Sequence, residues 1–128
     1  MAQVMHDLAN SFPGAKLLLV FGSVAKGTET TSSDLDIAVL MDHELSADEK
    51  LELIESVGLQ TGRAVDLVDL RSVGQPLLNQ IVQANTRILG TDEEYARLLM
   101  RNVCDNEDFV PMLRRLLRER RHRWIEKS

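Results

Sequence analysis

The sequence predicts an α/β (α+β) fold, in which a small mixed β-sheet is flanked by helices. Strand-like segments alternate with segments of helical periodicity along the 128 residues, and 44% of the residues are hydrophobic. A chain of this length can bury a substantial core on its own. Because the linkers are short and no internal repeat is found, we expect a single domain over 1–128, with a core at about 16–90 and C-terminal helices at about 91–128.

The first third of the chain is expected to form a helix and two strands. Apolar residues at helical spacing predict an amphipathic helix that ends near Pro13. The apolar run 17–21 predicts a strand buried on both faces. After a polar loop, the alternating and β-branched segment 34–41 predicts a second strand.

The central part is expected to add a helix and a third strand. Ser46 and Glu49 have the spacing of a capping box, and apolar residues follow at helical spacing. We therefore expect a helix that runs to about Gly58. Residues 63–70 alternate between apolar and polar types, which predicts the third strand.

The last part is expected to be mainly helical. Pro76 marks the first turn of a short helix, and residues 86–90 predict a short edge strand. Thr91 and Glu94 form a second capping-box pattern, which opens another helix. Pro111 interrupts or restarts this helix, and an apolar stripe predicts a final one.

Asp34 and Asp36 are the first candidate site residues. Residues two apart on a strand point to the same face, so their carboxylates should lie side by side. Adjacent like charges repel and raise each other's pKa unless a cation lies between them. Hard oxygen ligands of this kind suit Mg²⁺, which keeps part of its coordination shell for water and substrate phosphates. The pair therefore predicts a divalent-metal site.

A third carboxylate is expected from the strand at 63–70, which offers Asp66 and Asp69. They lie three residues apart and so face opposite sides of the strand, which means that only one can join the pair. We choose Asp66 because it lies in mid-strand, where an unpaired acid would be costly. Asp69 lies at the exit of the strand next to Arg71, where a solvated or paired acid is ordinary.

The Gly-Ser pair before the aspartates predicts a phosphate site. Gly22 allows the backbone to approach a ligand closely, and Ser23 offers a hydroxyl group and a backbone N–H. The following residues can open a helix whose N-terminus attracts phosphate, and Lys26 is within reach of a triphosphate. Phosphate and metal sites together indicate phosphoryl or nucleotidyl transfer, in which two metal ions about 3.5–4 Å apart bridge the reacting oxygens.

At these residues the sequence resembles the minimal nucleotidyltransferases (MNT) of the DNA polymerase beta superfamily. The family pattern G-S-x10-D-x-D is matched by Gly22, Ser23, Asp34 and Asp36. The surrounding positions also agree, and they are Phe21, Ala25, Lys26, Gly27, Ser33, Leu35 and Ile37. The third acid of the family, within a hydrophobic strand, matches Asp66. The resemblance implies a nucleotidyltransferase fold of the polymerase beta type.

More closely, the chain resembles MntA-type antitoxins, which are encoded beside HEPN-domain toxins. That resemblance implies a Mg²⁺-dependent adenylyltransferase, with ATP as co-substrate, that moves AMP to a tyrosine of the toxin ribonuclease and silences it. The toxin would be both acceptor and complex partner. The nucleotide would be held by Gly22, Ser23, Lys26 and Ser33. Asp34 and Asp36 would ligate two Mg²⁺ ions, and Asp66 would complete the metal site and assist deprotonation of the acceptor hydroxyl.

Two other functions stay open at this point. Related aminoglycoside nucleotidyltransferases modify small molecules, but they usually carry an additional helical domain, and few residues follow the strand at 86–90. The other alternative is a non-catalytic module that binds the toxin and blocks it sterically. All three acids are present. This argues against an inactive site, because a protein that no longer catalysed the reaction would not need to keep them.

Charge and composition limit the partners. Residues 111–128 hold seven basic and two acidic residues, which leaves a net −10 on the first 110 residues. Overall acidity disfavours nucleic acid as a partner. The longest apolar run is far too short to span a bilayer, so we expect a cytoplasmic protein with no membrane partner. We expect Cys104 to be a buried structural thiol and Tyr95, at helical spacing with two leucines, to be a core residue.

Overall fold

The structure, a computed structural model, describes residues 2–22, 34–105 and 117–118. These residues contain a four-stranded sheet of order β3-β2-β1-β4. The strands are β1 (Leu17–Phe21), β2 (Leu35–Leu40), β3 (Val65–Asp69) and β4 (Asn85–Gly90). Strand β1 is antiparallel to both β2 and β4, whereas β2 and β3 are parallel. The predicted mixed sheet is confirmed, with β4 at one edge.

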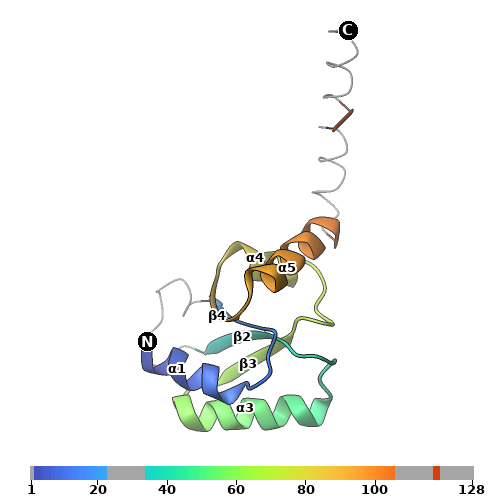
Figure 1. The fold of residues 1–128 in the computed structure, drawn as a ribbon. Coiled ribbons are helices and arrows are strands. Elements are labelled where there is room, and N and C mark those ends of the chain that lie inside the picture. Colours follow the sequence, from blue (N-terminus) through green and yellow to red (C-terminus); the bar gives the residue numbers. More distant parts are fainter. Residues whose placement is uncertain (1, 23–33, 106–116, 119–128) are drawn as a thin grey trace.

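Helices cover both faces of this sheet (Figure 1). They are α1 (Ala2–Ser11), α3 (Ala47–Thr61), α4 (Leu77–Gln83) and α5 (Asp92–Asp105). Side chains of α1 and α3 pack in one core cluster, and those of α4 and α5 pack in a second cluster on the opposite face. Among the described residues, none of the helices has the length and apolar character that crossing a bilayer requires.

Strand β1 lies at the centre of the molecule. All five of its side chains are buried, as the apolar run predicts. Leu18 and Val20 contribute to the cluster beneath α1 and α3, and Leu17, Leu19 and Phe21 to the cluster beneath α4 and α5. Since β1 also pairs with a strand on each side, it has neither a polar face nor a free edge.

Helix α3 begins with the predicted capping box. The Ser46 hydroxyl accepts a hydrogen bond from the Glu49 N–H at 3.1 Å, and the Glu49 carboxylate accepts one from the Ser46 N–H at 3.1 Å. The helix extends to Thr61, beyond the predicted end at Gly58. It ends there because Gly62, with φ of 68°, takes the left-handed conformation and donates its N–H to the Gly58 carbonyl at 2.9 Å.

Helix α5 begins at the second predicted cap, where the Thr91 hydroxyl accepts from the Glu94 N–H at 3.2 Å. Tyr95 packs against the cluster beneath α4 and α5, as expected of a core residue. The expectation that Cys104 is buried is wrong, because its side chain is exposed. The buried residues of α5 are Leu98 and Asn102, and a position two residues after Asn102 faces away from them. The predicted interruption at Pro111 lies outside the described residues.

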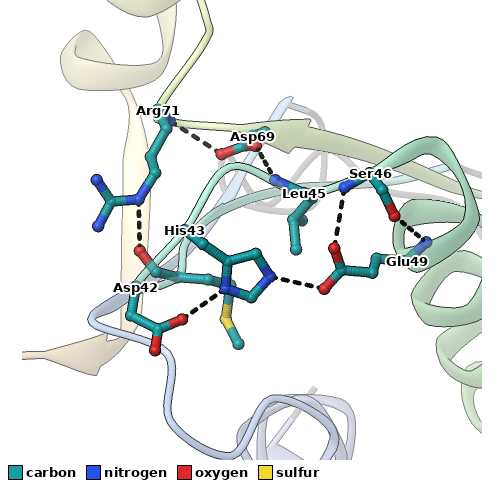
Figure 2. A network of polar contacts seen from close by, with 8 residues as sticks. Asp42, His43, Leu45, Ser46, Glu49, Asp69 and Arg71 are labelled. Atoms are coloured by element: carbon teal, nitrogen blue, oxygen red, sulfur yellow. Dashed lines mark hydrogen bonds and ion pairs between the residues drawn. The ribbon is translucent and has the colours of Figure 1, made fainter.

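Asp69 organises the connection between β2 and α3 (Figure 2). Its carboxylate accepts hydrogen bonds from the Leu45 N–H at 2.8 Å and from the Arg71 N–H at 3.0 Å. The Arg71 Nε–H in turn donates to the Met41 carbonyl at 2.8 Å. Asp69 is therefore paired, which was one of the two predicted alternatives. The other alternative, a solvated acid at the strand exit, is wrong because Asp69 is only 2% exposed. The backbone donors satisfy the charge that burial would otherwise leave unpaired.

His43 lies on the solvent side of the β2–α3 connection and forms ion pairs that stabilise it. Its two ring nitrogens lie 2.6 Å from the Asp42 carboxylate and 2.7 Å from that of Glu49 (Figure 2). Hydrogen bonds to Glu49 and then Asp42 raise the pKa of His43, and the same contacts lower the pKa of both acids. The protonated imidazole therefore links the β2–α3 connection to the first turn of α3.

We expect Asp69→Asn to destabilise the fold. An amide side chain has one acceptor oxygen, so one of the two backbone N–H groups of Leu45 and Arg71 loses its partner, at a cost of about 1–3 kcal/mol. Urea unfolding measures this loss. The matched control is Asp66→Asn on the same strand, where the side chain is exposed and the change should stay within about 0.5 kcal/mol. Equal stability of the two variants would contradict the role of Asp69.

We expect the His43 contacts to stabilise the fold only while the ring is protonated. Since folding raises this pKa, the contribution is complete below the unfolded value of about 6.5 and is lost as pH rises through the folded value. Urea midpoints between about pH 5.5 and 8.5 should therefore fall with pH in the wild type and less so in His43→Ala. His6→Ala, which removes a ring that contacts the neutral Asn10, should keep the wild-type slope.

Candidate active site

The sheet brings Asp36 and Asp66 together. In the parallel pair of β2 and β3, Asp36 lies directly opposite Asp66, and in the antiparallel pair of β1 and β2 it lies opposite Phe21. Neighbouring strands are about 4.8 Å apart, and directly opposed residues share a face of the sheet. Asp34 precedes β2 by one residue and has the same parity as Asp36. Asp36 and Asp66 therefore lie on the face that α4 and α5 cover, and Asp34 lies near Asp36 at the same end of the sheet.

The charges of these carboxylates affect one another. The pKa of Asp36 is raised, first by its partial burial and then by the negative charges of Asp66 and Asp34. Both effects disfavour the ionised form of Asp36. A bound cation would remove this penalty, so the charge distribution favours a positive ligand.

Gly22 lies at the end of β1, directly beside the Asp36 carboxylate. It follows the strand directly and has φ of 73°, a conformation that residues with a side chain rarely adopt. A Cβ atom at this position would lie 2.1 Å from a carboxylate oxygen of Asp36. The sequence predicts that Gly22 permits close approach to a ligand. The structure adds that its backbone already packs against the Asp36 carboxylate.

The remaining nucleotide-binding candidates, Ser23, Lys26 and Ser33, lie outside the described residues. The residues that flank this segment, Gly22 and Asp34, both lie at the end of the sheet where Asp36 is found. The segment therefore leaves and re-enters the described part of the chain at the candidate site.

The donor set suits a hard cation, although the described residues form no preformed cage. Across the described ranges 2–22, 34–105 and 117–118, no three His, Cys, Asp or Glu side chains gather as a ready metal-binding cluster. Asp34, Asp36 and Asp66 are close enough for two of them to perturb the third, and they offer only carboxylate oxygens. Such oxygens fit Mg²⁺.

The burial of the two acids on β3 is the reverse of what the sequence predicts. Asp66 is exposed because it lies near the beginning of β3, which is an outer strand of the sheet, and not in mid-strand as predicted. Asp69 is the buried acid, and its carboxylate serves the backbone of the β2–α3 connection. The predicted parity is correct. Asp66 and Asp69 point to different faces of the sheet, and Asp66 is the cross-strand partner of Asp36.

Asn85 is a neighbour of the site that sequence reasoning missed. It opens β4 opposite Phe21, on the side of β1 away from Asp36. Its side-chain amide donates to the Ile81 carbonyl at 2.8 Å and to the Tyr95 hydroxyl at 2.9 Å. Asn85 thus ties the end of α4 to α5 beside the site. The signal in the sequence was a polar amide residue directly before the expected strand at 86–90.

Comparisons with known proteins agree with this geometry. Residues 4–94 match the polymerase beta nucleotidyltransferase family. The protein adenylyltransferase MntA of Shewanella oneidensis is 36% identical over 92 residues, which cover 72% of this chain and 66% of MntA. The match therefore spans just under two thirds of that relative.

Solved structures of toxin-antitoxin complexes are similar over nearly the whole chain. One chain of a toxin-antitoxin crystal structure with AMP-PNP superposes with a TM-score of 0.70 at 28% identity, covering 98% of this chain and 95% of that one. A structure of a tri-AMPylated Shewanella oneidensis HEPN toxin with its MNT antitoxin gives a TM-score of 0.62 at 26% identity, with coverage of 98% and 92%. With its carboxylates at one end of a mixed sheet, the chain belongs to the polymerase beta nucleotidyltransferase family.

Proposed function

We propose that this chain is an antitoxin-type protein adenylyltransferase that transfers AMP from ATP to a tyrosine of a partner HEPN toxin. The observation that carries the proposal is the convergence of Asp36, Asp66 and Gly22 at one end of the sheet. The similarity to MntA supports AMP as the transferred group, and the similarity to HEPN toxin complexes supports the partner. Such a pair would work in the cytoplasm, where ATP is available.

In this proposal the polar residues around Gly22 hold the nucleotide. Ser23, Lys26 and Ser33 would bind the triphosphate together with the backbone of Gly22. Asp34, Asp36 and Asp66 would hold two Mg²⁺ ions. When bound, these ions neutralise phosphate charge and promote ionisation of the attacking hydroxyl.

Asp66 is suited to receive the acceptor's proton. A tyrosine hydroxyl has a pKa of about 10, so it needs help to ionise at neutral pH. Its oxygen would attack the α-phosphorus, the bond to the β-phosphate oxygen would break, and pyrophosphate would leave as the proton passes to Asp66. Because Asp66 is exposed on an outer strand, a tyrosine carried by a large protein can approach it.

We expect Asp36→Asn to reduce AMP transfer by about 10³-fold or more, because it removes a charge that the metal ions require. The assay uses α-labelled ATP, Mg²⁺ and lysate from the source cells, with the labelled products resolved by size. Addition of EDTA should abolish transfer by the wild type. Glu55→Gln, an equal charge change on an exposed position of α3, should leave it unchanged.

The destination of the label separates the candidate functions. Label on a discrete polypeptide supports protein adenylylation. If label appears only on small molecules, the chain modifies a metabolite or drug and the proposed acceptor is wrong. If the wild type binds ATP and transfers nothing, the chain acts as a steric toxin-binding module.

We expect Gly22→Ala to abolish transfer while the protein still folds. The added methyl group would displace the Asp36 carboxylate, from which an ideal Cβ is only 2.1 Å away. The matched control is Gly14→Ala. Gly14 has a similar φ of 82°, but a methyl group there would meet nothing within 4 Å, so this change adds only about 1–2 kcal/mol of backbone strain. Full activity of Gly22→Ala would show that the Asp36 position is not critical.

A further inference from the structure

A cavity of about 450 Å³ lies at the end of the sheet opposite the candidate active site. Lys16 precedes β1 and Leu40 ends β2, whereas Gly22 and Asp34 lie at the other ends of these strands. The five residues of β1 separate Lys16 from Gly22, and the six steps of extended chain between them correspond to about 20 Å. Among the described residues, the lining consists of Lys16, Leu40, Arg71, Glu94, Arg97, Leu98 and Arg101. The cavity is therefore separate from the carboxylate site.

The charge of this cavity is opposite to that of the chain around it. Residues 1–110 contain eight basic and 18 acidic residues. Four of those eight basic residues line the cavity, and among the described residues one acid, Glu94, lines it with them, while Glu93 and Asp105 pair with Arg97 and Arg101. Positive charge is thus concentrated at one place in an otherwise acidic domain, as in an anion-binding site.

Backbone carbonyl groups hold two of the cations in place. The Arg101 guanidinium donates to the carbonyls of Leu70 and Val73, and its Nε contacts Asp105 at 3.4 Å. The Arg71 Nε donates to the Met41 carbonyl at 2.8 Å, and in Figure 2 its terminal nitrogens point away from that network. Carbonyl groups fix the direction of a guanidinium without neutralising its charge, although Arg101 also forms an ion pair with Asp105.

The other two cations are less constrained. Arg97 contacts Glu93 at 2.7 Å and Glu94 at 3.0 Å, and its side chain is 65% exposed, so these pairs contribute little to stability. The Lys16 backbone N–H donates to the Leu40 carbonyl at 2.7 Å, which fixes the base of its side chain. Both side chains can therefore reorient toward a ligand.

We propose that this cavity binds a small molecule that carries two or more phosphate groups. Guanidinium groups match phosphate oxygens in a bidentate manner, and the four cations in the described part of the lining suit a multiply charged anion better than a single carboxylate. The volume lies in the range of small-ligand sites, and Leu40 and Leu98 supply an apolar wall. The proposal uses none of the residues assigned to AMP transfer.

The test is a titration of the whole chain with inorganic pyrophosphate and tripolyphosphate, in EDTA, followed by NMR. Without divalent metal, the carboxylate end repels these anions. We expect amide shifts at Leu40, Arg71 and Leu98, and affinity that falls as salt rises. Arg97→Gln and Lys16→Gln should each weaken binding about tenfold, since each removes one charged contact. Lys50→Gln on α3, outside the cavity, is the matched control and should bind as the wild type does.

Three results would overturn the proposal. Shifts confined to Gly22, Asp34 and Asp66 would mean that these anions bind only at the candidate active site. Equal weakening by Lys50→Gln would mean that the attraction is non-specific. Shifts at Leu40 and Leu98 with a short RNA but not with pyrophosphate would identify the cavity as part of a nucleic-acid surface. None of these results depends on whether the chain transfers AMP.

Discussion

The complete enclosure of β1 is the constraint on which the rest of the structure depends. Its five side chains are buried beneath helices on two faces, and both of its edges carry strand partners. A shift of one residue would exchange the side chains of its two faces, so the cores on both sides fix its register. That register places Phe21 opposite Asp36, and Gly22, the next residue, against the Asp36 carboxylate. The geometry of the candidate site is thus set by hydrophobic packing at the centre of the sheet.

Asp66 and Asp69 on β3 have different roles because they point to different faces of the sheet. Asp66 shares the face of Asp36, is exposed, and adds negative charge to the site. Asp69 has the opposite parity, is buried, and accepts hydrogen bonds from two backbone N–H groups. An exposed carboxylate remains available to a metal ion or a proton. A buried one, satisfied by the backbone, stabilises the connection that follows β2.

The sheet separates opposite charges along its strands. Carboxylates gather where β1 ends and β2 begins, and the basic cavity lies where β1 begins and β2 ends. Strands β1 and β2 are antiparallel and largely buried between these ends, so they act as a rigid spacer of about 20 Å. The acidic end attracts cations. The basic end attracts anions, and the carboxylates are too far away to repel them strongly.

Local pattern alone determined much of this protein. Strand burial at 17–21 and the cap at Ser46 and Glu49 both follow from spacing, because backbone periodicity is a local property. Only tertiary structure decided what packs against each face. Asp66 was exposed rather than buried, Cys104 was exposed, and the cations of the basic cavity came from three separate parts of the chain. Burial depends on which elements meet, and spacing within one element does not contain that information.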